Sequence, residues 1–545
     1  MKKYFLITAL LLSGAINALA CTNFIVGKKA SADGSVMVTY NDDSYGKYGY
    51  LCHYPASLHA KGEMRKIYNW ENGKYLGEIP EAAQTYNVVG NINQFQLCIT
   101  ETTFGGREEL VDPEGILDYG SLIYIALQRC RTAREAIGLI TGLVEEYGYY
   151  STGESFSVCD KEEAWILEMI SKGKGEKGCV WVAVRIPDDC ISGHANQSRI
   201  TSFPLNDKKN CIYSKDVISF ARSKGYFNGK DEDFSFRDAY NPLDFSGIRA
   251  CDARVWSFFR TYDESMDQYL PYLNGDATAP SMPLYIKTDH KITAQELKDA
   301  MRNHYEGTAL DLTSDAGAGP WKMPYRPSPL TFKDSQGTEY FNERPVSTQQ
   351  TAFTLVSQLR NWLPDEIGGL MWFGCDDANM IAYVPVYCST TRIPEGFAKS
   401  TSNAATFNPN SAFWICNMVS NMIYPRYSAM IGDLRDAQSE LELYYESNRD
   451  AVEQQAIAIS AEGRTEFLNR QLETDVRKMM DRWQQLAGYI IVKHNDMVVR
   501  NEVDGKFEEI SDEKCKVTRT GVDQSVKDLI GSTTGDRYKV SFISE

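Results

Sequence analysis

Residues 21–43 read CTNFIVGKKASADGSVMVTYNDD and set the start of the fold. Two runs of apolar and β-branched residues, 22–26 and 36–40, lie on either side of a polar stretch that contains Ser-Ala-Asp-Gly. Strand-forming runs separated by Gly, Ser and Asp are typical of a β-hairpin. The segment therefore predicts two antiparallel strands joined by a short turn.

The hairpin returns the triplet Asn41-Asp42-Asp43 to the beginning of its first strand. If the turn centres near Ser31, antiparallel pairing places Cys21 opposite about Asn41, and facing Cα atoms in such a ladder lie about 5 Å apart. We therefore expect one amide and two carboxylates beside Cys21.

The residues before Cys21 have the composition of an export signal. Residues 2–3 are lysines, 4–16 form an apolar segment and 18–20 read Ala-Leu-Ala. A basic start, an apolar core and small residues at the cleavage site are typical of a removable signal peptide. Cleavage after Ala20 would make Cys21 the first residue of a mature protein in the periplasm or outside the cell.

A lipoprotein signal also ends in a cysteine and is the alternative for this segment. Such signals usually place Leu three residues before the cysteine and a small residue next, whereas Ala18 and Leu19 stand here in the opposite order. We therefore predict ordinary cleavage with a free Cys21 amine.

The composition excludes several classes of function. The chain of 545 residues has a net charge of −16 and shows no basic block, so we expect no nucleic-acid partner. After the N-terminal segment no apolar run reaches the roughly 18 residues that a membrane-spanning helix needs. The six histidines are scattered without ligand spacing, and we expect no metal and no cofactor. Pairing among the thirteen cysteines cannot be deduced from the sequence, and most of them read as buried apolar residues.

Strands and helices occur in separate blocks along the rest of the chain. Strand-like runs are 96–100, 156–159, 164–170, 179–186, 351–356, 368–373 and 381–384, and helical spacing covers 122–131 and 133–146. Thr293 to Glu296 form a capping box that opens a helix towards His304. This block order predicts an α+β fold of antiparallel sheets covered by helices.

The C-terminal part is predicted to be helical. Residues 411–486 carry long amphipathic runs, and Pro425 should break or kink the first of them. We expect a signal peptide at 1–20, a catalytic domain at 21–405, a helical region packed on it at 406–488 and a tail at 489–545, which begins with a strand at Tyr489–Val492.

A cysteine at a mature N-terminus supplies a nucleophile and a base in one residue. A free α-amine has a pKa near 7.7–8.0 and can accept the thiol proton near neutral pH. A carboxylate near the protonated amine can orient it, and we assign this role to Asp43. Acyl transfer also needs a donor aimed at the developing oxyanion, and the side-chain amide of Asn196, in the loop His194–Ile200, is suitable.

At these residues the chain resembles the secernin/dipeptidase A family of cysteine peptidases, part of the N-terminal-nucleophile (Ntn) hydrolase superfamily. The matching segments are Cys21-Thr22, Gly34-Ser35, Asn41–Asp43, Ile99–Thr103, Trp165–Glu168, His194–Ile200, Gln358–Asp365, Val384–Tyr387 and Tyr424–Tyr427. The resemblance implies an αββα sandwich, a cysteine nucleophile, no metal and hydrolysis of dipeptides. By motif position it carries Asp43 and Asn196 over as catalytic residues with Cys21. Tyr40 stands where an arginine often precedes Asn-Asp-Asp.

For substrate binding we expect Asn41, Asp42, Glu101 and Arg199, and the acidic members could bind the ammonium group of a dipeptide. Two other functions stay open. One is an amidase or acyltransferase of the bile-salt or penicillin acylase type, and the other is a non-catalytic binding protein anchored by lipid through Cys21. The sequence also leaves a homo-oligomer open.

Overall fold

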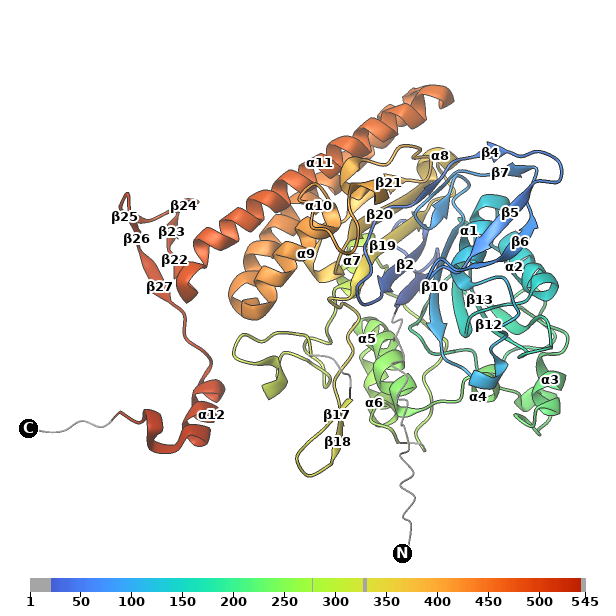
Figure 1. The fold of residues 1–545 in the computed structure, drawn as a ribbon, viewed down its shortest axis with the longest axis horizontal. Coiled ribbons are helices and arrows are strands. Elements are labelled where there is room, and N and C mark those ends of the chain that lie inside the picture. Colours follow the sequence, from blue (N-terminus) through green and yellow to red (C-terminus); the bar gives the residue numbers. More distant parts are fainter. Residues whose placement is uncertain (1–20, 277, 327–330, 541–545) are drawn as a thin grey trace, which may run out of the picture.

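The computed structural model describes residues 21–276, 278–326 and 331–540. Its centre is a seven-stranded antiparallel sheet in which the predicted hairpin forms the middle pair (Figure 1). The strands, in spatial order, are β16 (Tyr285–Lys287), β14 (Cys190–His194), β1 (Asn23–Val26), β2 (Val36–Asp43), β19 (Thr351–Leu359), β20 (Gly369–Cys375) and β21 (Val384–Tyr387).

A second antiparallel sheet of eight strands faces the first, and β10 and β11 contact β2 across the interface. Its strands, in spatial order, are β15 (Cys211–Tyr213), β13 (Cys179–Ile186), β12 (Ala164–Ser171), β11 (Gly153–Cys159), β10 (Cys98–Phe104), β9 (Ile92–Asn93), β8 (Val88–Val89) and β3 (His53–Tyr54). Buried apolar side chains fill the space between the two sheets.

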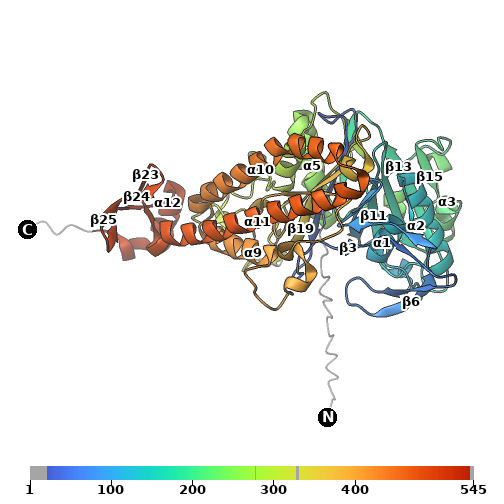
Figure 2. The same ribbon diagram turned by 90° about the horizontal axis from the view of Figure 1, so that it is seen from above.

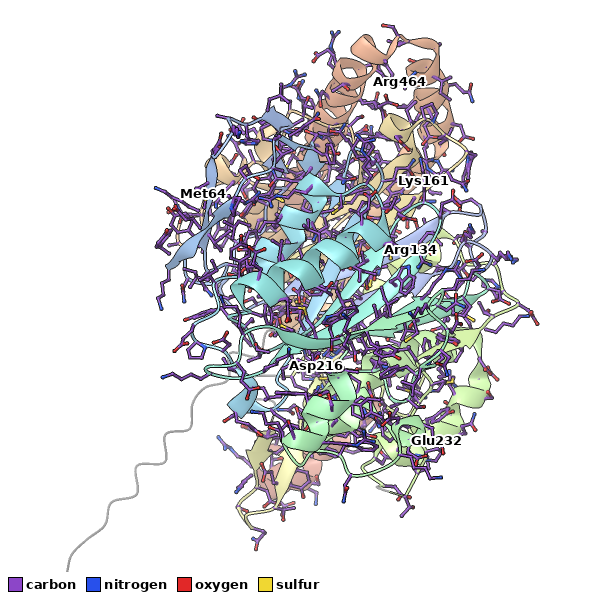
Figure 3. The ribbon with its side chains drawn as sticks, turned by 90° about the vertical axis from the view of Figure 1, so that its right-hand side faces the viewer. Met64, Arg134, Lys161, Asp216, Glu232 and Arg464 are labelled. Atoms are coloured by element: carbon purple, nitrogen blue, oxygen red, sulfur yellow. The ribbon has the colours of Figure 1, made fainter. Side chains whose placement is uncertain are left out.

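Helices cover the outer faces of both sheets. The second sheet is covered by α1 (Tyr119–Arg129) and α2 (Ala133–Tyr147), which lie in front of it in Figure 3. The first sheet contacts α5 (Ala253–Tyr262), α7 (Ala294–Met301), α9 (Ala412–Ile423), α10 (Tyr427–Ala458) and α11 (Ala461–Lys493). The predicted α+β class with antiparallel sheets is therefore confirmed.

Shorter elements complete the fold. The remaining helices are α3 (Val217–Ser223), α4 (Phe236–Tyr240), α6 (Leu270–Leu273), α8 (Asp365–Gly368) and α12 (Gln524–Thr534). Six two-stranded ladders pair β4 (Ser57–Leu58) with β7 (Gln84–Thr85), β5 (Met64–Tyr68) with β6 (Tyr75–Pro80), β17 (Thr331–Lys333) with β18 (Glu339–Phe341), β22 (Val498–Arg500) with β27 (Val517–Arg519), β23 (Glu502–Val503) with β24 (Lys506–Phe507), and β25 (Glu509–Ser511) with β26 (Lys514–Cys515).

The hairpin forms as predicted, with a register that differs by one residue. Ile25 pairs with Val38, and an isolated bridge joins Thr22 to Asn41. The same register places Cys21 opposite Asp42 rather than Asn41. The turn is therefore centred half a residue later than expected, and this small difference decides which carboxylate shares a face with the thiol, because side chains alternate between faces along a strand.

Local capping explains where two of the helices begin. The Thr132 side chain accepts a hydrogen bond from the Glu135 N–H at the start of α2, and the predicted capping box of Thr293 and Glu296 opens α7. The helix predicted to run towards His304 ends at Met301.

The C-terminal region contains two long helices that lie side by side (Figure 2). The predicted break at Pro425 is a short 3-10 turn, Tyr424–Arg426, between α9 and α10. The strand predicted at Tyr489–Val492 is wrong, because these residues form the last turns of α11. Their β-branched side chains favour a strand locally, but Ile490 is buried on the packed face of the helix, and packing outweighs this weak preference. Strand pairing begins only at Val498.

The segment after α11 forms an arm that stands away from the sheets, at the left of Figure 1. None of the helices in the described ranges is both long and apolar enough to cross a membrane. All thirteen cysteines are free, and nine of the twelve besides Cys21 are buried, as expected of apolar packing residues.

Candidate active site

The two faces of the β1–β2 hairpin carry different chemistry. Cys21, Tyr40 and Asp42 share the face directed at the second sheet, whereas Asn41 and Asp43 face the helices that cover the first sheet. All five residues are buried. The face directed at the second sheet, with Glu101 from β10, is called the thiol face below, and the opposite one the helix face.

On the thiol face, the Cys21 thiol lies between a phenol and a carboxylate. Its Sγ lies 3.6 Å from Glu101 Oε1 and 3.8 Å from Tyr40 Oη, as a donor to both, and Tyr40 Oη donates to the same Glu101 oxygen at 2.5 Å. Burial raises the pKa of the Cys21 thiol well above its ordinary value. The negative charges of Glu101 and Asp42 raise this pKa further.

Glu101 reaches the hairpin because β10 loses its neighbour on one side. Strand β9 pairs with β10 only at Cys98, so the edge of β10 is open at Glu101 among the described strands. The side chain of Asn23 fills this edge and donates to the Glu101 carbonyl at 2.7 Å. Burial raises the pKa of the Glu101 carboxyl to about 6, although hydrogen bonds from Glu154 and Tyr40 oppose the shift.

Asp42 forms the second acidic group of the thiol face. Its carboxylate lies 2.7 Å from Lys47 Nζ, and the Lys47 side chain is partly exposed. The side chains that hydrogen-bond the Cys21 thiol are a phenol and a carboxylate.

Asp43 lies on the helix face and forms a buried ion pair. Its Oδ2 accepts from Arg344 Nη2 at 2.7 Å, and its Oδ1 accepts from the Thr351 hydroxyl at 2.5 Å. The register extends Asp43 one residue beyond the position opposite Cys21, on the side of the Cys21 backbone nitrogen. The Asp43 main-chain N–H also hydrogen-bonds the Cys21 thiol and lowers its pKa, against the larger effect of burial.

Asn41 is held by the core. Its amide donates to the carbonyl oxygen of Val346 at 3.1 Å, and its Oδ1 accepts from the Thr354 hydroxyl at 2.6 Å. These contacts direct Asn41 away from the thiol. The structure brings together Cys21, Asp42 and Glu101, and leaves Asn41 as a group that fixes β2 against β19.

Arg254 of α5, which was not predicted from the sequence, hydrogen-bonds the backbone at Cys21. Its Nη1 donates to the Cys21 carbonyl at 2.6 Å and to the Thr22 hydroxyl at 2.8 Å, and its Nη2 donates to the Asn196 Oδ1 at 3.1 Å. Asn196 has a positive φ of 60° and donates through Nδ2 to the Thr103 carbonyl at 2.7 Å. One guanidinium thus joins the cysteine to the predicted oxyanion donor.

Arg254 and Arg344 supply the positive charges of the helix face, and both come from distant parts of the chain. Arg254 lies 233 positions from Cys21, and Arg344 lies 301 positions from Asp43. The one sequence signal for Arg254 is a charged residue within the apolar run of a short amphipathic helix. That signal does not say what the guanidinium contacts.

Glu168 positions the loop that carries Asn196. Its carboxylate accepts from the Ser198 hydroxyl and the Arg199 N–H, both at 2.5 Å, and from the Ile200 N–H. The Arg199 side chain turns away from Cys21 and pairs with Asp252 at 3.1 Å. Arg199 therefore supports the loop and is not brought to the thiol.

His194 is a structural residue in this arrangement. Its two ring nitrogens hydrogen-bond the hydroxyls of Thr102 and Ser157. Burial, and then the charge of Arg199, lower the pKa of His194 to about 3. A neutral imidazole held on both sides cannot act as a base at neutral pH.

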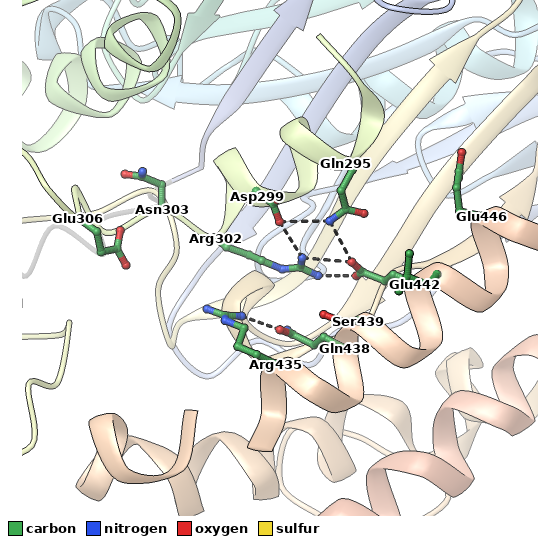
Figure 4. Close-up of a pocket in the computed structure, with 11 residues that line it drawn as sticks. Gln295, Asp299, Arg302, Asn303, Glu306, Arg435, Gln438, Ser439, Glu442 and Glu446 are labelled. Atoms are coloured by element: carbon green, nitrogen blue, oxygen red, sulfur yellow. Dashed lines mark hydrogen bonds and ion pairs between the residues drawn. The ribbon is translucent and has the colours of Figure 1, made fainter. Parts of the chain in front are cut away.

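The cavity of about 580 Å³ in Figure 4 lies between α7 and α10, away from Cys21. It is lined by charged groups that already pair, among them Arg302 and Glu442. None of its lining residues belongs to the thiol face. Within the described ranges, no cluster of three or more His, Cys, Asp or Glu side chains is placed to hold a metal ion.

These features define a class of α+β protein with two facing antiparallel sheets and a buried cysteine where a central hairpin begins. The chain matches the model of peptidase family C69 over residues 20–69 and 49–440. It belongs to peptidase family C69. The expected resemblance to the dipeptidase A family is thereby confirmed.

Curated relatives extend over most of the chain. A protein named probable dipeptidase from Salmonella dublin is 26% identical over 443 residues, which cover 76% of this chain and 93% of the relative. Dipeptidase A from Lactobacillus helveticus is 25% identical over 440 residues, 76% of this chain and 84% of that protein. A protein named probable dipeptidase A from Streptococcus pyogenes serotype M3 is 25% identical, with coverage of 81% and 90%.

Proposed function

We propose that this chain is an exported dipeptidase of the Ntn-hydrolase type and that Cys21, freed by removal of residues 1–20, is its nucleophile. The observation that supports this most is the position of Cys21. The thiol faces a carboxylate and a phenol, the carbonyl is gripped by Arg254, and the register puts Asp43 beside the backbone nitrogen. The names of the relatives support the substrate class.

The pKa of the thiol supports the α-amine as the base. Burial and the nearby carboxylates favour a protonated thiol. An amine on Cys21 itself has a pKa near neutrality and needs no further residue to reach the thiol proton. Asp43, held by Arg344 and Thr351, would orient that amine after cleavage.

The proposed reaction proceeds through a thioester. The amine takes the thiol proton, and the sulfur forms a bond to the carbonyl carbon of the peptide. Asn196 uses one N–H for Thr103, which leaves its other N–H for the oxyanion. The carbon–nitrogen bond then breaks, and the ammonium returns the proton to the leaving amine. Water hydrolyses the thioester and restores the thiol.

The acidic thiol face accounts for a substrate with a free amino group. A dipeptide carries its ammonium one residue from the scissile bond. Asp42 and Glu101 lie on the same side as the thiol and can bind that charge, which would position the reacting carbonyl. An N-acylated amide lacks the ammonium and gains nothing from these carboxylates.

The mature N-terminus provides the first test. Intact-mass and N-terminal analysis of the exported protein should show a free Cys21 amine. A diacylglyceryl cysteine, or a start at another residue, would overturn the mechanism, because an acylated amine cannot accept the proton.

Activity provides the second test. Cys21→Ala should abolish dipeptide hydrolysis while leaving the thermal unfolding midpoint close to that of the parent. A free dipeptide should be cleaved faster than its N-acetyl form or a conjugated bile salt. The reverse order would reject the dipeptidase assignment and favour an acylase.

A further inference from the structure

Glu154 lies beside Glu101 and has no part in the mechanism above. Strands β10 and β11 pair so that Thr103 stands opposite Glu154 and Glu101 opposite Phe156. The two glutamates are therefore diagonal neighbours on one face of the second sheet. Their exposed fractions are 2% for Glu101 and 0% for Glu154. Two carboxylates so close and so buried cannot both carry a charge, because repulsion and lost hydration favour one retained proton.

The hydrogen bonds around the two carboxyl groups leave one oxygen of each without a donor. Glu101 Oε1 accepts from Tyr40 and Cys21, and Glu154 Oε2 accepts from the Thr103 hydroxyl at 3.0 Å and the Tyr149 hydroxyl at 3.3 Å. The second oxygens, Glu101 Oε2 and Glu154 Oε1, are buried, and no N–H or O–H group of the described residues reaches them. The two carboxyl groups interact with each other, so a single proton held between them supplies the missing donor.

The surroundings assign the proton to Glu154. Burial raises the pKa of the Glu101 carboxyl to about 6, whereas burial and the charge of Glu101 raise the pKa of Glu154 well above its ordinary value. The geometry favours the same assignment: Glu101 accepts a hydrogen bond of 2.5 Å from Tyr40, whereas those that Glu154 accepts from Thr103 and Tyr149 are longer, at 3.0 Å and 3.3 Å, so the charged form is better stabilised at Glu101. At neutral pH the pair therefore consists of a Glu101 carboxylate and a Glu154 carboxylic acid.

The charged and titratable groups around the pair agree with this assignment. Asp42 and Tyr40 face it from β2, Tyr119 faces it from α1, and Tyr149 follows α2. The Lys47 ammonium forms an ion pair with Asp42. No ion pair to either glutamate occurs in the described part of the chain, so the second negative charge would stand without compensation.

We propose that Glu154 is a positioning residue that works as a protonated acid: it donates a hydrogen bond to Glu101 and holds that carboxylate toward the thiol and the substrate ammonium. The role in ammonium binding rests on the function proposed above. The role of Glu154 as a donor rests on the surroundings of the pair and does not depend on that function.

The glutamine variant tests whether Glu154 is a donor. Glu154→Gln replaces a neutral acid with a neutral amide that can donate the same hydrogen bond, whereas Glu154→Ala removes the donor. We expect Gln to keep kcat/KM for a free dipeptide within about threefold, and Ala to lower it by about tenfold to a hundredfold, since a hydrogen bond to a charged group is lost. The acid limb of the pH profile should move to higher pH in Ala and stay in place in Gln.

The opposite ranking would overturn the proposal. If Glu154 works as a carboxylate, Gln loses the charge and should be damaged as severely as Ala. Both variants should first show parental thermal unfolding midpoints. If Ala does not fold, the Gln variant and the spectroscopic measurement below still decide.

Infrared spectroscopy tests the proton without reference to activity. In protein carrying 13C only in glutamate carboxyl groups, the C=O stretching band of a protonated acid should be present at neutral pH and absent in Glu154→Gln. A parent without this band would contradict the proposal. The inactive Cys21→Ala variant should retain it. Dipeptide hydrolysis by Cys21→Ala would reject the proposed function while leaving the proton on Glu154 standing.

Discussion

Asp42 and Asp43 are neighbours in the sequence but lie in opposite environments. Asp42 is on the thiol face, paired with Lys47, whose side chain reaches the surface. Asp43 is on the helix face, enclosed by Arg344 and Thr351. Side-chain alternation along β2 separates them, so one strand supplies an acid to each side of the sheet.

The difference extends to the whole site. The thiol face gathers carboxylates, whereas the helix face gathers the guanidinium groups of Arg254 and Arg344. The cations of the helix face hydrogen-bond the Cys21 carbonyl and the Asp43 carboxylate rather than the sulfur. The guanidinium group of Arg254 therefore holds the backbone of Cys21 in place. Burial and the carboxylates of the thiol face keep the thiol protonated until a base removes the proton. Four substitutions break or sharpen this contrast.

The largest expected effect is on stability, at Asp43. Asp43→Ala leaves the Arg344 charge without its buried partner and should lower the free energy of unfolding by about 3–5 kcal/mol. Urea titration followed by circular dichroism measures it. Asp42→Ala on the other face is the matched control and should lower the same quantity by less, because its partner Lys47 keeps contact with solvent when the carboxylate is removed. Equal losses would remove the distinction between the two faces.

The second-largest effect is expected from losing the hydrogen bonds of Arg254 to Cys21 and Asn196. Arg254→Met keeps the buried stem and removes the donors to Cys21 and Asn196, so kcat should fall by about tenfold to a hundredfold with a smaller change in KM. Arg260→Met, on the same helix and paired with partly exposed Asp267, is the control and should retain parental kinetics. An unchanged kcat in Arg254→Met would assign Arg254 to the fold alone.

A smaller effect is expected from the charge of Asp42. Asp42→Asn should lower kcat/KM for a free dipeptide by about tenfold, since one carboxylate is lost near the substrate ammonium. The same variant should cleave the N-acetyl dipeptide at its parental, slow rate. Steady-state assays with both substrates measure the two rates. A parallel loss on both substrates would contradict a role in ammonium binding.

The smallest effect concerns pH. Because the pKa of Glu101 is about 6, kcat/KM should rise as the pH increases through 6 and the carboxylate forms. As the pH rises from the ordinary carboxyl pKa to 6, the free energy of unfolding should fall, because the folded protein binds this proton more tightly than the unfolded chain does. Tyr40→Phe removes one donor and should move the rise to higher pH by less than about one unit. A profile that is flat around pH 6 would dissociate Glu101 from substrate binding.

Local patterns were sufficient to predict the hairpin, the longest strands of the two sheets and most of the covering helices, but not α5 or the short strands. Their signals are short-range: alternation, caps and turn residues. The register was predicted one residue short, because the turn centre was set by composition and pairing with β14 and β19 was not available to the sequence argument. That single residue separates Asp42 from Asn41 as the neighbour of Cys21.

The rest of the site depends on contacts between distant segments. The motif around Asn196 identified the loop, but Arg199 within it pairs with Asp252, and no local pattern shows this. Arg254 and Arg344 come from segments without any recognisable motif. The strand predicted at Tyr489–Val492 failed for the same reason, since burial of Ile490 against the fold decides for helix.

The pairing of β2 with β19 has a consequence for biosynthesis. Asp43 meets Thr351 across 308 positions, so the central sheet cannot close until most of the chain has been made. Contacts between residues so far apart in the sequence slow folding. The chain must lose the entropy of loop closure before these contacts can form and stabilise it. If the chain is exported as proposed, Cys21 crosses long before Thr351, and the surroundings of the proposed nucleophile form last. The thiol would then stay open to oxidation and to folding catalysts throughout that interval.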